Sequence, residues 1–319
     1  MIYTNNFDEG ITQLERKVAF LAFPIIYSTK RLLSIQVKYL LWCFIFGVLI
    51  YICINWYVIY ETYDNDLVLR NRFGYNFTLH SYFRKSKFYI HHTYLGMYLT
   101  FAIVCCFYFL KIYNQIFIKA LLLFILIVFI INFPLLASKI SLFVLFFSLM
   151  SFTLFNNKFH KKTLSTLFLF SLVLVFIGFI IFNDWVKILF ERSIGERLYL
   201  WSIAIEEIKN NYIIGVGTGD VLDTLNETYS MEYKDYYPHN SSFVFFLRFG
   251  VIGLFTLIAF YFILIKKAIK HDNSLLFTFT LIVFISSLTE HIYERHIGIL
   301  FIIFFFSILY NYLDETDTI

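Results

Sequence analysis

The chain has 319 residues, of which 60% are hydrophobic and 15% are charged, and its mean hydropathy is +0.72. This balance excludes an ordinary soluble domain and indicates an integral membrane protein. The net charge of +4 arises from basic residues in short connections between apolar runs, so we expect no nucleic-acid partner.

Apolar runs of about 20 residues, the length that a helix needs to cross a membrane, recur along the chain. They lie near 39–59, 92–110, 117–137, 140–155, 164–182, 241–265, 274–289 and 297–312. A shorter run at 18–28 contains Pro24 and is open to three interpretations: a ninth span, a half-helix or an interfacial segment. We therefore expect an all-α polytopic membrane protein with about eight to nine transmembrane helices.

The distribution of Lys and Arg predicts which connections are cytoplasmic. Basic residues cluster in alternate connections, at 30–38, 111–119, 158–162 and 266–270. This places the connections 60–90, 183–240 and 290–296 on the outer face, although the basic residues within 60–90 argue against the scheme. We expect one membrane domain: transmembrane helices in 1–182 with an outer loop at 60–90, a long outer loop at 183–240, and further transmembrane helices in 241–319.

The long outer loop is predicted to carry an amphipathic helix. Ser193 and Glu196 have capping-box spacing. Beyond them apolar residues recur every three or four positions, at Ile194, Leu198, Trp201, Ile205, Ile208 and Tyr212. Such a helix suits the outer membrane surface or the mouth of the bundle. Arg197, one turn before Trp201, is placed to meet a lipid-linked anion; alternatively it snorkels or pairs with Glu191 or Glu196.

A glycine-rich stretch, IIGVGTGDV, follows this helix at 213–221. Glycine-rich turns can cradle phosphates, but the nucleotide-binding forms need a preceding strand, so we favour a helix stop and a tight turn packed against the bundle. Asp220 and Asp223 lack the spacing of a calcium loop, and we expect no metal site built by the protein.

The stretch YYPHNSSF at 236–243 places His239 and Asn240 at the edge of an apolar run. A histidine at that depth can serve as a general base, whereas an interfacial His and Asn can also merely cap the helix. Arg248, nine residues further on, is predicted to lie about two and a half turns deeper. An intramembrane arginine is a functional candidate, although a pairing with Glu290 would be purely structural.

Several short motifs in this order resemble the carboxy-terminal signature of the O-antigen ligase and polymerase superfamily. They are RSIGERLYLW at 192–201, IIGVGTG at 213–219, YPHNSSF at 237–243 and LRFGVIGL at 247–254. SKISLF at 138–143 is similar to the S-R element of that family, with Lys139 where Arg is usual, and Glu290 is a looser match. Lysine keeps the charge there but loses the bidentate geometry of arginine.

The resemblance implies a metal-independent, inverting glycosyl transfer in which the glycan of an undecaprenyl-pyrophosphate donor moves to an acceptor hydroxyl. The expected site is periplasmic, on a multi-pass protein of the bacterial cytoplasmic membrane, with membrane lipid around it and no cofactor. His239 would act on the acceptor hydroxyl, and Arg197 would hold the pyrophosphate. Substrate contacts are expected from Arg192, Lys139, Trp201, Asn240, Arg248 and Glu290.

Three acceptors are open within that family: lipid A core for a ligase, a second lipid-linked repeat for a polymerase, or a protein hydroxyl for an O-oligosaccharyltransferase. His92, at the start of another span, is placed either to line the acceptor side or to belong to an aromatic belt. A flippase of lipid-linked sugars is the alternative from another class. The absence of a visible repeat and the titratable residues at outer helix ends favour an enzyme.

Overall fold

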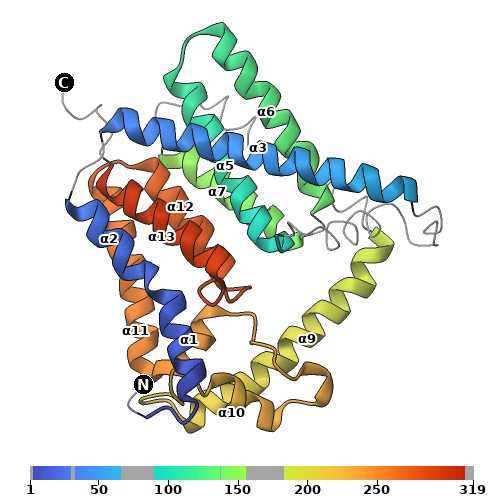
Figure 1. Ribbon diagram of the computed structural model, residues 1–319, viewed down its shortest axis with the longest axis vertical. Helices are drawn as coiled ribbons and strands as arrows, with labels where there is room; N and C mark the ends of the chain where they lie inside the picture. Colours follow the sequence, from blue (N-terminus) through green and yellow to red (C-terminus); the bar gives the residue numbers. More distant parts are fainter. Residues whose placement is uncertain (1–2, 30–32, 66–89, 137, 156–182, 313–319) are drawn as a thin grey trace. The chain divides into compact units, whose positions relative to one another are not determined.

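The computed structural model describes residues 3–29, 33–65, 90–136, 138–155 and 183–312, and the elements within these ranges are helices (Figure 1). They are α1 (Phe7–Lys17), α2 (Ala19–Thr29), α3 (Ser34–Asn65), α5 (His92–Ile112), α6 (Ile116–Leu135), α7 (Lys139–Phe155), α9 (Asn183–Asn210), α10 (Val221–Thr228), η1 (Met231–Tyr233), α11 (Ser241–Lys270), α12 (Ser274–Ser287) and α13 (His296–Asn311). The predicted span at 164–182 and residues 66–89 of the predicted outer loop lie outside the described residues.

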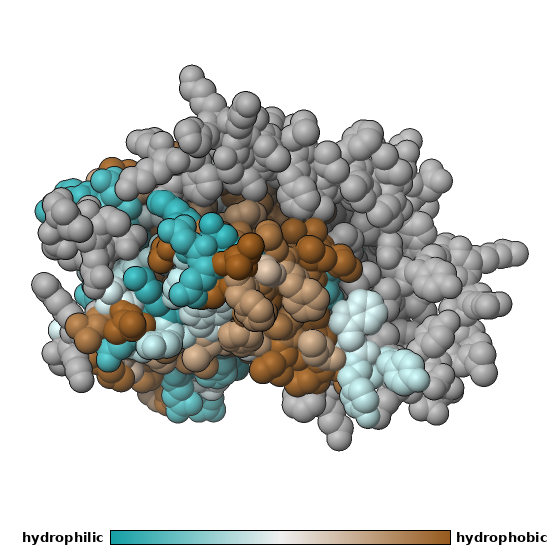
Figure 2. Space-filling model, turned by 90° about the horizontal axis from the view of Figure 1, so that it is seen from above, coloured by the Kyte–Doolittle hydropathy of each residue, from teal (hydrophilic) through white to brown (hydrophobic). Residues whose placement is uncertain are grey.

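Seven described helices correspond to predicted spans. Four are long and apolar enough to cross a membrane, at Ser34–Val58, His92–Ile112, Ile116–Phe133 and Ser241–Lys270, and three are shorter apolar helices, at Ile140–Phe155, Ser274–Ser287 and His296–Asn311. Large hydrophobic side chains such as Phe124, Ile252 and Phe262 are exposed on them. Figure 2 shows broad hydrophobic areas of the surface beside hydrophilic ones. The prediction of an all-α polytopic membrane protein is confirmed.

The described helices form two compact units, one of α3, α5, α6 and α7 and the other of α1, α2 and α9 to α13. In the first unit α5 is central, because it packs against α3, α6 and α7. The start of α5 lies against the start of α7, where Gly96 leaves room for Ser141.

The second unit joins the amino-terminal helices to the carboxy-terminal ones. The Pro24-containing run forms α2, which directly follows α1 and packs along α13 (Figure 1). The side-chain amide of Asn311 donates to the carbonyl oxygen of Tyr27 at 3.4 Å. The amino terminus therefore packs with the last described helix, although almost the whole chain separates them in sequence.

The sequence predicted one continuous helix for the apolar run after His239. The structure shows a broken one. Gly250 has φ 62° and ψ −153°, and it breaks α11 into segments 241–249 and 251–270. A side chain at Gly253 would collide with the carbonyl oxygen of Phe245, eight residues earlier, which in a straight helix lies about 12 Å away. Phe245 and Tyr261 also both contact Tyr293. The short segment therefore folds back along the long one, and α11 is a helical hairpin.

The glycine-rich turn satisfies the backbone groups that this break leaves without helical partners. Val216 and Gly217 donate their N–H groups to the carbonyl oxygens of Leu247 and Arg248, at 2.7 and 3.3 Å. The N–H of Val251 donates to Tyr212 O at 2.8 Å. The structure shows a tight turn packed against the bundle, and the three hydrogen bonds named here join backbone groups of the protein itself.

The segment before α1 holds the other side of this turn. The backbone N–H groups of Asn5 and Asn6 donate to the carboxylate of Asp220, at 2.8 and 2.6 Å for the shortest contacts. The hydroxyl of Thr4 accepts from the N–H of Gly219 at 3.0 Å. Residues 3–6 thus fasten the turn that supports the α11 hairpin.

Candidate functional site

Helix α9 supports the candidate site from one side. It begins at Asn183, so Ser193 lies ten residues inside it and the predicted capping box at Ser193 and Glu196 is wrong. The buried face also differs from the predicted stripe. It consists of Leu200, Ile203, Ala204 and Ile208, which pack against Val221, Leu225 and Leu247, whereas Ile194, Leu198, Ile205 and Tyr212 are exposed. The buried face includes the small residue Ala204, which a search for large apolar residues does not count.

Trp201 on α9 holds the loop that carries His239. Its indole N–H donates to the carbonyl oxygen of Pro238 at 2.7 Å, and its ring packs edge-on against Phe243. His239, the next residue, has φ 46°, a left-handed conformation that is uncommon outside glycine. Strained backbone of this kind persists where neighbouring contacts fix it, and it clusters at functional sites.

Asn240 follows and caps α11, because its side-chain oxygen accepts from the N–H groups of Ser242 and Phe243 at 2.9 and 3.4 Å.

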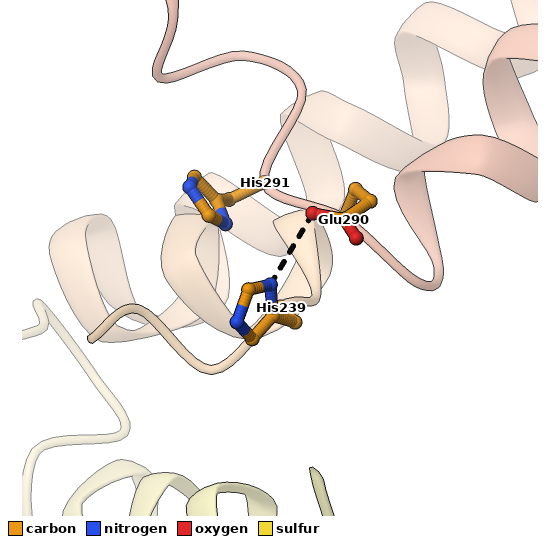
Figure 3. Close-up of side chains that lie close together, drawn as sticks. All are labelled: His239, Glu290 and His291. Atoms are coloured by element: carbon orange, nitrogen blue, oxygen red, sulfur yellow. Dashed lines mark hydrogen bonds and ion pairs between the residues drawn. The ribbon is translucent and has the colours of Figure 1, made fainter. Parts of the chain in front are cut away.

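The side chain of Glu290 contacts both His239 and Arg197, and Figure 3 shows its contact with His239. His239 Nδ1 lies 3.2 Å from Glu290 Oε2, and Arg197 Nη2 lies 3.6 Å from Glu290 Oε1. Glu290 is buried, whereas the side chains of His239 and Arg197 are 26% and 29% exposed. The buried carboxylate of Glu290 thus orients the His239 imidazole beside the Arg197 guanidinium. The imidazole and the guanidinium are both partly exposed, so a substrate can reach them.

A second histidine, which sequence analysis did not single out, completes the cluster. The ring centroid of His291 is 5.2 Å from that of His239 and 5.3 Å from that of Tyr237. Burial lowers the pKa of His291 to about 4, so its ring is neutral at physiological pH. The turn EHIYERH at 290–296, with two Glu, two His and one Arg between apolar helices, carried the signal that could have found it.

Arg248 lies in a buried ion cluster next to this site. Its guanidinium donates to both carboxylate oxygens of Glu294, at 2.7 and 2.9 Å, and to the carbonyl oxygen of Thr218 at 3.2 Å. Lys17 from α1 lies 3.4 Å from the same carboxylate. Burial alone would raise the pKa of Glu294, but the charges of Arg248 and Lys17 outweigh it and hold that pKa below its usual value.

The alternative that Arg248 pairs with Glu290 is wrong, because its guanidinium binds both carboxylate oxygens of Glu294. Residues 241–249 form one helical segment, so Arg248 lies about two and a half turns beyond His239, as predicted, and its depth in the membrane stays a prediction. The guanidinium of Arg248 is buried and bound by Glu294 and Thr218, and the role of Arg248 as a substrate contact stays a prediction.

The other predicted site residues are Lys139, His92 and Arg192. Lys139 begins α7 and His92 begins α5, both in the other unit, and the His92 ring lies 4.1 Å from that of His91. Arg192 lies on α9, five residues before Arg197. Their roles as substrate contacts remain predictions.

The described part of the chain is thus a polytopic membrane protein whose polar cluster couples a histidine and a carboxylate, both next to helix ends, to an arginine in the middle of α9. A family model described as O-antigen ligase matches residues 90–258, which is more than half of the chain. The chain belongs to the O-antigen ligase family. Membership supports glycosyltransferase-like activity of the O-antigen ligase or polymerase type on lipid-linked glycans, in a bacterial membrane. A search of the curated proteins finds no match to the chain.

Proposed function

We propose that the chain is an O-antigen ligase-like glycosyltransferase that uses undecaprenyl pyrophosphate as its glycan carrier. The acceptor is a hydroxyl group, such as one of lipid A core, and transfer takes place at the periplasmic face of the cytoplasmic membrane. The observation that supports this proposal is the arrangement of His239, Glu290 and Arg197, because it joins an oriented base to a cation within one site.

The base is His239, and Glu290 sets its tautomer. With the Nδ1 proton directed at Glu290 Oε2, the lone pair of Nε2 is the one that can take a proton. The acceptor oxygen attacks the anomeric carbon while the bond from this carbon to the pyrophosphate oxygen breaks. The hydroxyl proton passes to Nε2, the pyrophosphate leaves with the bonding electrons, and the configuration inverts. No metal or nucleotide takes part in this scheme.

Arg197 binds the leaving group. A guanidinium has five N–H donors, so one contact with Glu290 at 3.6 Å leaves donors for pyrophosphate oxygens. Its charge stabilises the negative charge that develops on the leaving group. Arg192 or Lys139 is our candidate for a second cation, and Trp201 and Asn240 position the loop that carries the base.

The test is transfer from purified lipid-pyrophosphate donor to lipid A core in vesicles, with His239→Ala and Arg197→Ala compared with wild type. We expect a loss of roughly 100-fold or more for each, since general bases and oxyanion-stabilising groups contribute on that order. His239→Ala should lower kcat and leave the affinity for the donor unchanged. Arg197→Ala should lower both kcat and the affinity for the donor. His296→Ala and Arg295→Ala, exposed residues of the neighbouring turn, are the matched controls.

Full activity of His239→Ala would remove the base assignment. Transfer by the wild type to a second lipid-linked repeat, or to a protein hydroxyl, in place of lipid A core would assign the chain to the polymerase or protein-glycosylating branch. The family membership admits each of these acceptors.

A further inference from the structure

The His291 side chain has a buried ring nitrogen, Nδ1, next to the candidate site. Among the described residues Nδ1 has no hydrogen-bond partner, and the residue is only 7% exposed. Figure 3 shows its ring and that of His239 beside the Glu290 carboxylate. A polar atom buried without a partner costs free energy, so its position calls for a ligand that fills the space.

The three side chains have the spacing of a metal centre. One ligand atom from each of His239, Glu290 and His291 lies within 4.8 Å of the others. In a tetrahedral zinc site with bonds of about 2.1 Å, ligand atoms lie about 3.4 Å apart. The pair of His239 Nδ1 and Glu290 Oε2, at 3.2 Å, already forms one such edge. A small movement of the His291 ring toward this pair completes the triangle, since the three ligand atoms already lie within 4.8 Å of one another.

We propose that His239, Glu290 and His291 form an inhibitory zinc site, in which the ion silences the base of the transfer reaction. Two imidazoles and one carboxylate suit Zn²⁺, with a fourth position left for water. Mg²⁺ and Ca²⁺ prefer oxygen ligands and six or more of them, so this set selects against both.

Glu290 can bind the ion without losing its arginine. Its Oε2 faces His239, whereas its Oε1 faces Arg197, so the ion and the guanidinium use different oxygens. Arg197 therefore helps to orient the ligating carboxylate, but its positive charge repels the ion. We therefore expect reversible binding on the order of micromolar strength, weaker than that of a structural zinc site.

The inhibition follows from the tautomer of His239. Zinc takes the lone pair of Nδ1, so the proton of the neutral ring moves to Nε2. Nε2 then donates a hydrogen bond and cannot accept the proton of the acceptor hydroxyl. Arg197 still holds the donor, so zinc should lower kcat and leave the donor KM nearly unchanged. This consequence rests on the proposed function, whereas metal binding itself does not.

Binding is tested on the full-length chain after treatment with EDTA, by its melting temperature in ZnCl₂ or MgCl₂. Zinc at about 100 µM should raise the melting temperature by several degrees, and magnesium should not. His291→Asn and Glu290→Gln should each remove the rise, while His296→Asn, which changes an exposed histidine of the same turn, should keep it. Melting without metal shows whether each variant is folded.

A rise that persists in both His291→Asn and Glu290→Gln would overturn the site. So would a rise that disappears only when His91 and His92 are replaced together, because the ion would then bind the other unit.

Inhibition is measured as the zinc concentration that halves each protein's own zinc-free transfer rate. His291→Asn should raise this concentration at least tenfold relative to the wild type and His296→Asn. Zinc binding without inhibition would refute the proposal that zinc blocks the base, but the zinc site itself would stand. A wild type without transfer activity that still shows the zinc-dependent rise would contradict the proposed function and leave the metal site in place.

Discussion

At the scale of single residues, the Glu290 carboxylate is the group on which the candidate site depends. It is buried, and both His239 and Arg197 face it. Replacement by Gln keeps the shape but permits the wrong His239 tautomer, since an amide can donate a hydrogen bond to Nδ1. We expect Glu290→Gln to lower kcat at least tenfold with a smaller change in donor KM, by analogy with carboxylates that orient catalytic histidines. An unchanged kcat would mean that His239 needs no orientation.

Lys17 gives the folded protein a specific dependence on alkaline pH. Burial lowers its pKa to about 8, although the charge of Glu294 opposes this shift. Between pH 8 and 10 the unfolded chain keeps the Lys17 proton and the folded chain has lost it, so stability rises with pH in this window. The contribution is about 2 to 3 kcal/mol. Lys17→Met should remove this rise from melting curves, and Lys209→Met on α9 should keep it.

At the scale of elements, the α11 hairpin depends on Gly250. Its positive φ and its contact with the carbonyl oxygen of Ile213 leave no room for a side chain. Gly250→Ala should destabilise the protein by about 2 kcal/mol or more, from backbone strain and the clash together. Gly195→Ala is the matched control, since its added methyl group meets open space in α9 and should be neutral or mildly stabilising. Equal melting temperatures for the two variants would contradict the hairpin.

The positions of the helices could be predicted, because they follow from the lengths of the apolar runs. The break in α11 could not, because it depends on the backbone angle of one residue, Gly250. Seven of the eight apolar runs form helices, and the eighth lies outside the described residues. Nothing in LRFGVIGL distinguishes a continuous helix from a reversal at Gly250, so the hairpin could not be predicted. His239, Arg197 and Glu290 were found through motifs. His291 could have been found from the polar turn EHIYERH, whereas only the fold brings Lys17 to Glu294, 277 residues away in the chain.

At the scale of the whole molecule, the amino-terminal segment joins the two ends of the second unit. Asp220 binds the backbone of Asn5 and Asn6 from a buried position, whereas Asp223 accepts from the Asn6 side chain in solvent. Asp220→Ala should cost about 1 to 3 kcal/mol and expose the segment to trypsin at Arg16 and Lys17. Asp223→Ala should cost less than about 1 kcal/mol. Equal rates of tryptic cleavage would show that residues 3–6 do not fasten the turn.

The short helices on either side of the Glu290 turn have a consequence for the lipid around the protein. With 14 and 16 residues, α12 and α13 are about 21 and 24 Å long, less than the hydrocarbon thickness of about 30 Å. A bilayer adapts to short helices by thinning, at a cost that grows with acyl-chain length. Vesicles of short-chain phospholipids should therefore support faster glycan transfer than long-chain ones at equal protein content. The rate of glycan transfer should thus depend on the thickness of the host membrane, and it should be higher in a thinner one.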